Sequence, residues 1–465
     1  MRKAGTALVV LLLFLAGAAS ASAVELQAGP VRAFTENILT VSSGEGGSLT
    51  IEAWNGMLPL ENPVTDLRIE AGTVEIPWDG LSYGGEPVPA GKITLRATLT
   101  GPGRTVEQAE ITTTAVNPMP AAVCCLPAAQ RFYPDGKSTL KIEVALSAGG
   151  AWEVSAAPKE NPENTVWHQK GRSDGKIPVV LRWNGMHRAG MRCEAGEYVI
   201  SAWTKGCPEQ VCTATVTLLE EPLPDLMPAV TGSLIPEDLS DEAAVWKALT
   251  APVVTGDGAE GSGFPIMGEK GARRGKIGTV NGRTAGIAVL EMTDDGWAKV
   301  GVWKNEDGQY IDGWVKSDRL RVVRPNDRYG AVVDKKTQTM MIYEDGRKIG
   351  TLPVSTGFTT EEDRTADTHS GVYLMGARMQ DFTQGKQKYC YPVRIDGPNL
   401  IHSTGYAMKD GLRDYEEEIA LLGSKASHGC IRMDPRTTEE NGGINAWWVW
   451  THMGHDTKII VIPDE

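Results

Sequence analysis

Short runs of alternating apolar and polar residues make up most of the chain after residue 23, and turns rich in glycine, proline and asparagine separate them. Ser48–Trp54 and Ile93–Leu99 are two such runs. A period of two places every second side chain on the same side of the backbone, as in a strand with one buried face. We therefore predict a mainly β, multidomain protein that begins with a sandwich of antiparallel strands over residues 24–118.

The pattern occurs twice. Twelve residues after its Trp, the turn Trp78–Gly80 is followed by the strand Ala90–Leu95, and Trp183–Gly185 is followed at the same interval by Ala195–Ile200. Equal internal spacing at an offset of 105 residues indicates two copies of one module. A second β-sandwich is therefore expected over residues 119–219.

Both copies resemble the immunoglobulin-like module of flagellar hook-capping proteins, in which a Trp-Asp/Asn-Gly turn precedes an Ala-Gly-x-Tyr strand. We expect the glycine of each turn to adopt a positive φ and the Trp to pack on the sandwich. Neither copy holds a catalytic constellation, and fold alone does not fix function. A spacer or adhesion role is expected, with sugar binding by exposed aromatic residues as the alternative.

Residues 220–263 are rich in proline, glycine and acidic residues, which predicts a linker. One short helix is expected inside it, with Ser240 as its N-cap and acidic residues in its first turn. Trp246 is the residue expected to dock this helix.

The strand pattern returns over residues 264–323, in Gly286–Leu290, Gly296–Val300 and Gly313–Lys316. The Gly-Trp-x-x-Val and Gly-Trp-Val patterns in these runs resemble those of a bacterial SH3-like module. The resemblance implies a domain that binds cell-wall peptides. A small barrel that only packs on the following domain is the alternative.

The last domain is expected over residues 328–465. Ala331–Asp334 and Thr339–Tyr343 have the pattern of paired strands joined by a polar turn. Ala446–His452 is apolar and predicts a helix that ends before Gly454, and a final strand follows it. This part of the chain is therefore β-rich with a few helices.

Charge and the N-terminal residues restrict the protein's location and partners. The formal net charge of −13 at pH 7 argues against nucleic acid and anionic membrane surfaces as partners. Residues 1–23 have the pattern of a signal peptide, with a basic start, an apolar run and a cleavage site at Ala21–Ala23. A retained anchor is the weaker alternative, because the apolar run is short. We expect a secreted protein of the cell wall or periplasm, with no stable membrane anchor after cleavage.

Seven cysteines leave at least one thiol unpaired, which suits a catalytic role. Disulfides are plausible within residues 120–218, with their pairing open, and Cys390 is expected to be buried and structural. No Cys or His group has the spacing of metal ligands, so no metal site is predicted. His369, His452 and His455 lie outside any motif and are expected to be structural.

The candidate chemistry lies in Ser427–Met433, taken together with the earlier Ile401–Gly405. A thiol must lose its proton before it attacks a carbonyl, and a nearby histidine is its usual base or ion-pair partner. Cys430 is therefore the candidate nucleophile. Gly429 before it permits a tight turn and close approach of a substrate, and successive backbone N–H groups there can bind an oxyanion.

These residues resemble the signature of the L,D-transpeptidase catalytic domain of the YkuD type, which has a His, a spacer and then Ser/Thr-His-Gly-Cys, a hydrophobic residue and Asn or Arg. Ser427–Arg432 fit this signature in register. Val354–Gly357 and Thr368–Tyr373 are similar to the small-residue turns of the family. The resemblance covers roughly the last third of the chain.

The resemblance implies acyl transfer on peptidoglycan. Cys430 would attack the carbonyl before the terminal D-Ala of a tetrapeptide stem, form a thioester, and pass the acyl group to the side-chain amine of another stem as a 3-3 cross-link. His402 would be the base and Ser403 would orient its imidazole. The backbone around His428, Gly429 and Cys430 would supply the oxyanion hole.

The resemblance also suggests how the substrate is bound. Arg432 is a candidate for contacting a substrate carboxylate, because its planar fork suits that geometry, and Ser427 is a second candidate for substrate binding. Peptidoglycan stem peptides are the implied partners, and cell-wall glycan stays open as a further one. No metal or organic cofactor is implied.

The acyl acceptor stays open because the spacer between His402 and Ser427 is longer than is usual in the family. It carries an acidic insert around Asp410–Glu418. An L,D-carboxypeptidase and an enzyme that attaches a protein amine to the wall are alternatives at the same site. The alternative of another class is a non-catalytic wall-binding protein in which Cys430 is idle or oxidised.

Overall fold

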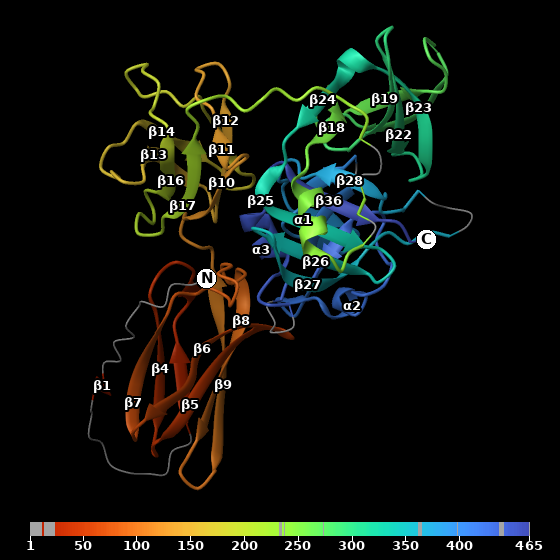
Figure 1. Ribbon diagram of the computed structural model, residues 1–465. Helices are drawn as coiled ribbons and strands as arrows, with labels where there is room; N and C mark the ends of the chain where they lie inside the picture. Colours follow the sequence, from red (N-terminus) through yellow and green to blue (C-terminus); the bar gives the residue numbers. More distant parts are fainter. Residues whose placement is uncertain are drawn as a thin grey trace. The chain divides into compact units, whose positions relative to one another are not determined.

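The structure is a computed structural model that describes residues 12–13, 24–231, 235–236, 238–272, 274–360, 365–397, 399–436 and 441–464 (Figure 1). All but two residues of the predicted signal peptide lie outside the described residues. The protein is mainly β and multidomain, with 52% of residues in strands and 5% in helices. Contacts divide it into two compact units, Met1–Ala121 with Tyr406–Glu416 and Ala122–Gly405 with Glu417–Glu465.

The first unit is built around two facing sheets, here called the first sandwich. Its strands are β1 (Leu12–Leu13), β2 (Glu25–Ala28), β3 (Val31–Arg32), β4 (Asn37–Ser43), β5 (Gly47–Asn55), β6 (Leu58–Ile69), β7 (Gly72–Trp78), β8 (Gly91–Thr100) and β9 (Val106–Val116). The sheet orders are β1-β7-β4-β2 and β3-β9-β8-β5-β6. Alternate residues of β5 are fully buried, as expected for strands that enclose a core between two sheets.

The first unit also contains a hairpin from far along the chain, formed by β33 (Ala407–Lys409) and β34 (Leu412–Asp414). This hairpin packs on β5 and β8. The backbone N–H of Arg413 donates to Oδ1 of the buried Asn55 at 2.7 Å. The acidic insert recognised in the sequence therefore has a folded hairpin within it, held by the first sandwich.

The second sandwich repeats the topology of the first. Its strands are β10 (Ala122–Pro127), β11 (Arg131–Phe132), β12 (Leu140–Leu146), β13 (Gly150–Pro158), β14 (Trp167–Ser173), β15 (Val179–Trp183), β16 (Gly196–Thr204) and β17 (Cys212–Leu218). The sheet orders are β10-β12-β15 and β11-β17-β16-β13-β14, which match the first sandwich strand for strand apart from β1. The repeat is thus visible in the strand order, and the immunoglobulin-like identity stays a prediction.

The Trp-x-Gly turns have the same geometry in both sandwiches. Gly80 and Gly185 adopt φ values of +68° and +72°. The indole N–H groups of Trp78 and Trp183 donate to the carbonyl oxygen of the residue three positions later, at 3.2 Å and 3.3 Å. Both Trp side chains are buried, so each turn is fixed from its sandwich core.

The predicted linker over residues 220–263 contains two packed elements, α1 (Glu242–Thr250) and β18 (Val253–Gly256). Asp241 caps α1, because its carboxylate accepts hydrogen bonds from the amides of Ala243 and Ala244. The prediction of Ser240 as the N-cap is wrong by one residue. Its hydroxyl donates to Asp238 instead.

The apolar face of α1 packs on the C-terminal domain, as Figure 1 shows for the face formed by β25, β36 and β26. The cluster consists of Val245, Leu249, Val253, Val332, Tyr343, Val372, Leu374 and Ile460. Trp246, the residue expected to dock the helix, is only partly buried at its edge. The ammonium of Lys458 donates to the carbonyl oxygen of Ala248 at 2.6 Å, where the C-terminal end of a helix favours a cation.

The small β domain, residues 253–323, contains β18 and a sheet of order β20-β19-β23-β22-β21. Its remaining elements are β19 (Gly263–Met267), β20 (Lys276–Asn281), β21 (Ala288–Thr293), β22 (Trp297–Trp303), β23 (Tyr310–Lys316), the 3₁₀ helix η1 (Ser317–Arg319) and β24 (Leu320–Val323). β24 pairs with β18, so the domain begins before the predicted boundary at residue 264. Its SH3-like identity stays a prediction.

The C-terminal domain is an eight-stranded sheet of order β28-β36-β25-β26-β27-β35-β32-β31 with short additions. Its strands and helices are β25 (Asn326–Asp334), β26 (Thr339–Glu344), β27 (Arg347–Ser355), β28 (Gly371–Leu374), β29 (Phe382–Gln384), β30 (Gln387–Tyr389), β31 (Val393–Asp396), β32 (Asn399–Ser403), α2 (Glu416–Ile419), β35 (Ile431–Met433), α3 (Ala446–His452) and β36 (Thr457–Ile462). Within the second unit one apolar cluster runs from the second sandwich through the small β domain into this sheet.

Three properties of the described residues bear on the remaining expectations. Cys124, Cys125, Cys193 and Cys212 are free thiols in the structure, so the disulfides considered among them within residues 120–218 are not formed there. In the described part of the chain, no helix has the length and apolar character needed to cross a membrane. Within the same part, no group of three or more His, Cys, Asp or Glu residues is arranged to hold a metal ion.

We predict that Leu249→Ala lowers the free energy of unfolding by about 2–5 kcal/mol, because it leaves a cavity where α1 packs on the sheet. Leu249 is fully buried, and its side chain lies against Gly330. Denaturant unfolding measures the change. Lys247→Ala, on the exposed face of the same helix, is the control. An equal effect of both substitutions would show that α1 is not docked as described.

Candidate active site

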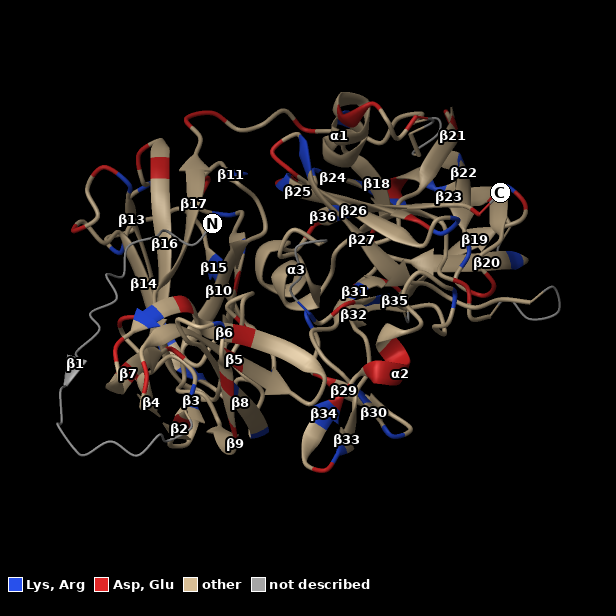
Figure 2. Ribbon diagram, turned by 90° about the horizontal axis from the view of Figure 1, so that it is seen from below, with Lys and Arg blue, Asp and Glu red and all other residues tan. Residues whose placement is uncertain are grey.

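Two neighbouring strands position the candidate catalytic residues (Figure 2). β32 and β35 pair in parallel, with Ile401 opposite Ile431 and His402 opposite Arg432. The two isoleucines are buried in the core, so the alternation of side chains places His402 and Arg432 on the other face of the sheet. Cys430 directly precedes Ile431, the first residue of β35, so the same pairing brings the backbone of Cys430 next to that of β32.

The loop before Cys430 is held by close packing and hydrogen bonds. Gly429 has a φ of +110°, and a Cβ at this position would lie 2.3 Å from Oδ1 of Asn399, so only glycine fits. The Thr368 hydroxyl donates to the Gly429 carbonyl oxygen at 2.8 Å and accepts from the Gly357 amide at 2.8 Å. Both small-residue turns noted in the sequence thus support the nucleophile loop.

Ser427 is used inside this loop. Its hydroxyl donates to the carbonyl oxygen of Cys430 at 2.5 Å and accepts from the amide of Gly429 at 3.2 Å. The contact of Ser427 with substrate stays a prediction. Because the Gly429 amide is engaged, the backbone N–H groups of His428 and Cys430 are the stronger candidates for binding an oxyanion.

His402 lies in a cage of aromatic rings. The rings of Tyr389 and Phe382 meet it edge to face, with centroids 5.0 Å and 5.3 Å away. Its Nδ1 lies 2.6 Å from the carbonyl oxygen of Ser403. A ring nitrogen that faces a carbonyl oxygen must carry the proton, so Nε2 holds the free lone pair. Burial lowers the pKa of His402 to about 4, so the imidazole is neutral at pH 7.

Ser403 therefore acts on the imidazole through its carbonyl group. Its hydroxyl accepts from the backbone N–H of Cys390 at 3.0 Å and donates to the carbonyl oxygen of Thr404 at 2.9 Å. These bonds fix the backbone just after His402. Cys390 is buried.

Burial also raises the pKa of Cys430, although a backbone hydrogen bond from Leu400 and the charge of Arg432 act in the opposite direction. The thiol is therefore protonated near neutral pH, beside a neutral imidazole. This combination favours general-base removal of the thiol proton during attack over a preformed thiolate–imidazolium pair.

Arg432 is buried and already has a carboxylate partner. Its Nη1 donates to Oε2 of Glu418 at 2.8 Å, and its guanidinium lies over the ring of Tyr389 with Cζ 5.3 Å from the centroid. Figure 2 shows the acidic α2, which contains Glu418, beside β32 and β35. Contact of Arg432 with a substrate carboxylate stays a prediction. Because Nη1 pairs with Glu418, such a contact would use the other nitrogens of the guanidinium.

The other histidines lie in different surroundings. His428 is exposed. His369 is buried, with Nδ1 2.6 Å from Oδ2 of Asp396. His452 stacks on Trp448, and His455 pairs with the carboxylates of Glu260 and Asp456. None of the last three histidines lies in β32 or β35.

The C-terminal domain is similar to domains of known proteins. Residues 328–461 match the family model of the L,D-transpeptidase catalytic domain, the YkuD type. The C-terminal domain is therefore similar to the L,D-transpeptidase catalytic domain. The putative L,D-transpeptidase YciB of Bacillus subtilis is 28% identical over 134 residues, which are 28% of this chain and 63% of that relative. The chain thus spans less than two thirds of the length of that relative.

Solved structures of L,D-transpeptidases are also similar. The enzyme from Mycobacterium smegmatis matches with 15% sequence identity and a TM-score of 0.24, over 38% of this chain and 82% of that one. The enzyme from Xylanimonas cellulosilytica matches with 16% identity and a TM-score of 0.21, over 29% of this chain and 60% of that one.

The roles of three residues in the C-terminal domain could not be predicted from the sequence. Asn399 restricts Gly429, Tyr389 covers both His402 and Arg432, and Glu418 neutralises Arg432. Glu418 lies in the acidic insert, so its charge was visible and its partner was not. Asn399 and Tyr389 have no sequence signal, because their roles arise only when β30 and β32 meet the nucleophile loop.

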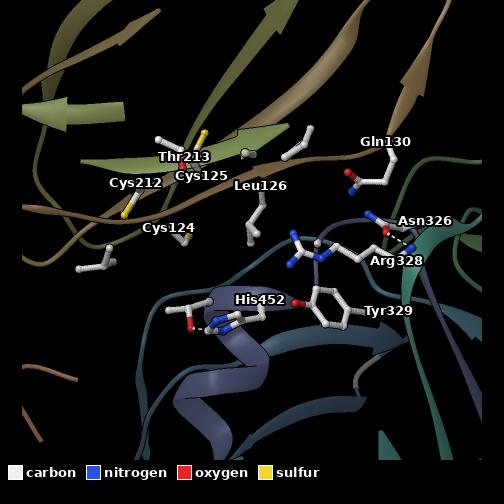
Figure 3. A pocket seen from close by; sticks show the side chains of 15 residues that line it. Cys124, Cys125, Leu126, Gln130, Cys212, Thr213, Asn326, Arg328, Tyr329 and His452 are labelled. Atoms are coloured by element: carbon white, nitrogen blue, oxygen red, sulfur yellow. Dashed lines mark hydrogen bonds between the residues drawn. The ribbon is translucent and has the colours of Figure 1, made fainter. Parts of the chain in front are cut away.

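A separate pocket of about 280 Å³ lies between the second sandwich and the C-terminal domain (Figure 3). Cys124, Cys125 and Cys212 line it from one side, and Tyr329 and His452 line it from the other. Burial raises the pKa of Cys124 to about 11 and that of Cys212 to about 12, so these thiols are protonated at neutral pH. None of the residues around Cys430 lines this pocket.

We predict that Gly429→Ala lowers the free energy of unfolding by about 1–3 kcal/mol through backbone strain, and displaces the nucleophile loop from Asn399. Thermal unfolding and the alkylation rate of Cys430 measure the two effects. Gly423→Ala is the matched control, since Gly423 has a φ of +84° but no heavy atom near its would-be Cβ. Equal loss of Cys430 reactivity in both variants would contradict the described packing.

The pH dependence of Cys430 alkylation tests the neutral thiol–imidazole pair. Because burial raises the Cys430 pKa, we expect the rate with iodoacetamide to rise about tenfold per pH unit from pH 6 to pH 8. Mass spectrometry of the peptide that contains Cys430 separates it from the other six thiols, with glutathione as the reference. A rate that is flat from pH 5 to pH 8 would instead indicate a thiolate–imidazolium pair.

Proposed function

We propose that this protein is a peptidoglycan L,D-transpeptidase whose nucleophile is Cys430. The observation that carries the proposal is the parallel pairing of β32, which contains His402, with β35, whose first residue directly follows Cys430. This pairing lies inside residues 328–461, which match the catalytic domain of that family. Of the seven cysteines in the sequence, Cys430 is the one within the family's Ser-His-Gly-Cys signature.

The chemistry begins with a proton transfer. The Nδ1–H of His402 is held by the carbonyl oxygen of Ser403, so Nε2 can accept the thiol proton as Sγ of Cys430 attacks the carbonyl before the terminal D-Ala. The backbone N–H groups of His428 and Cys430 would stabilise the oxyanion. Collapse of this intermediate breaks the C–N bond, leaves a thioester on Cys430, and returns the proton to the amine of the departing D-Ala.

The second half of the reaction transfers the acyl group from Cys430 and regenerates the free thiol. The side-chain amine of another stem attacks the thioester, forms an amide and restores the thiol, which gives a 3-3 cross-link. His402 again takes and returns a proton, because a neutral imidazole can do both. Water in place of the amine would give a tripeptide, the carboxypeptidase outcome.

Arg432 supports recognition of a substrate carboxylate in this proposal. Its Nη1 pairs with Glu418, but its Nε, which is buried, has no hydrogen-bond partner among the described residues. A buried donor without a partner is costly unless a ligand satisfies it. The terminal carboxylate of a stem peptide has the chemistry to do so.

The rest of the chain fits an extracytoplasmic enzyme. The signal pattern of residues 1–23 supports export to the cell wall or periplasm. We propose the two sandwiches as immunoglobulin-like modules with a spacer or adhesion role. The small β domain is proposed to be SH3-like, and its packing within the core of the catalytic domain favours a structural role over independent wall binding.

Incubation with purified disaccharide-tetrapeptide tests the proposal through the masses of the products. We expect a dimer lighter than two substrates by one D-Ala and linked through third-position residues. Cys430→Ala should abolish it, and His402→Ala should lower its rate at least a hundredfold, since a positioned base contributes about 10²–10⁴-fold.

Cys390→Ala is the control, because Cys390 is a buried thiol of the same domain that lies outside the motif. Release of a tripeptide alone would identify a carboxypeptidase. Product formation by the Cys430→Ala protein would refute the assignment of the nucleophile.

A further inference from the structure

We propose that Asn305 of the small β domain is a positioning residue for Cys430 and that it acts through Asp396. The small β domain then belongs to the machinery that sets the geometry of the nucleophile. The inference rests on the proposed function for the role of Cys430. The contacts that carry it are independent of any substrate.

Asn305 reaches from one domain into a buried carboxylate of the other. With its amide oriented to satisfy both neighbours, its side-chain N–H donates to Oδ1 of Asp396 at 3.0 Å, and its oxygen accepts from the backbone N–H of Asn281 at 3.2 Å. His369 donates from Nδ1 to the other oxygen of Asp396 at 2.6 Å. Asp396 is only 2% exposed, so the loss of either donor would leave a buried carboxylate oxygen unsatisfied.

The turn that carries Asn305 is rigid and lies close to its partner domain. The backbone N–H of Asn305 donates to the carbonyl oxygen of Thr279 at 2.7 Å, and the Glu306 carboxylate accepts from both the amide and the hydroxyl of Thr279. A Cβ on Gly308, at φ +67°, would lie 2.7 Å from Oδ2 of Asp367 and 2.9 Å from the His369 ring. The fit allows little movement of this turn.

Asp396 is connected to Cys430 through the backbone of β32. It pairs in register with Asn399, whose Oδ1 lies against Gly429. The next residue, Leu400, provides the backbone hydrogen bond to Cys430, which lowers the pKa of its thiol. Displacement of Asp396 therefore moves both the residue that packs on the loop and the group that binds the sulfur.

A second connection runs through His369. The residue before it, Thr368, donates to the carbonyl oxygen of Gly429. Asp396 is thus linked to two chain segments, one through Asn399 and one through His369, and each segment contacts the nucleophile loop. Asn305 restrains the carboxylate that they share.

Docking of the small β domain does not depend on Asn305. The backbone N–H of Gly286 donates to the carbonyl oxygen of Val372 at 2.7 Å, and that of Leu374 donates to Thr284 at 2.8 Å. These main-chain bonds, with the shared apolar cluster, attach the domain elsewhere. Substitution of Asn305 should therefore alter the geometry at Cys430 while the domains remain packed.

A reciprocal exchange tests the inference in the full chain. Asn305→Asp places two carboxylates against each other, whereas the double variant Asn305→Asp with Asp396→Asn restores the hydrogen bond between the two side chains with donor and acceptor exchanged. In the double variant the new amide oxygen at position 396 still accepts from His369. Gln309→Ala, an exposed residue of the same turn, is the control.

The readout is the pH profile of Cys430 alkylation, followed on its own peptide by mass spectrometry, with near-UV circular dichroism to report folding. We expect Asn305→Asp to raise the apparent pKa of Cys430 by about one unit, and to lower the alkylation rate at pH 8 about tenfold, through the weakened Leu400 hydrogen bond. The double variant should return both values toward those of the unchanged protein, and Gln309→Ala should leave them unaltered.

An unchanged profile in a folded Asn305→Asp protein would overturn the inference, and so would a shift that the double variant fails to reverse. Turnover of disaccharide-tetrapeptide separates this from the proposed function. If the unchanged protein makes no product but the alkylation profiles shift and recover, the proposed reaction fails and the positioning role stands. If product forms and Asn305→Asp matches the unchanged protein in both assays, the positioning role fails alone.

Discussion

The parallel pairing of two short strands, β32 and β35, is the constraint on which the candidate site depends. It aligns His402 with Arg432 and brings the loop that ends at Cys430 next to β32. Parallel strands cannot be joined by a tight turn, so the chain must leave the sheet and return between them. The long spacer between His402 and Ser427 is that connection, and it carries both the hairpin β33–β34 and the Glu418 that neutralises Arg432.

Burial determines the chemistry that this pairing allows. The aromatic cage around His402 and the close loop before Cys430 keep water away, which lowers the pKa of the imidazole and raises that of the thiol. The proton then stays on sulfur until a carbonyl is present to be attacked. A protonated thiol is also less easily oxidised than a thiolate.

Local patterns in the sequence predict much of the fold. Alternating apolar residues identify the strands, and the spacing after Trp78 and Trp183 reveals a repeat that the sheet orders reproduce. The nucleophile motif is also local, since one glycine, one thiol and their neighbours lie together in the chain. The sequence predicted the helix α1 but not the surface on which it docks. A short amphipathic helix in an acidic, proline-rich segment does not indicate which face of a neighbouring domain it will cover.

Residues that act across domains could not be predicted in this way. Asn305 and Asp396 are ordinary turn residues in sequence, and their hydrogen bond exists only because two domains share a core. The pairing of Glu418 with Arg432 could not be predicted either, because an acidic residue in a charged insert is usually solvated. Such pairs depend on tertiary contacts between distant segments, which periodicity and spacing do not encode.

The hairpin β33–β34 changes how the first sandwich is connected to the rest of the protein. The chain passes between the two units three times, after Ala121, before Tyr406 and after Glu416. The last two passages fall between His402 and Cys430. A pull on the first sandwich therefore reaches the backbone between base and nucleophile without passing through the second sandwich. The first sandwich is therefore connected directly to the chain segment between His402 and Cys430.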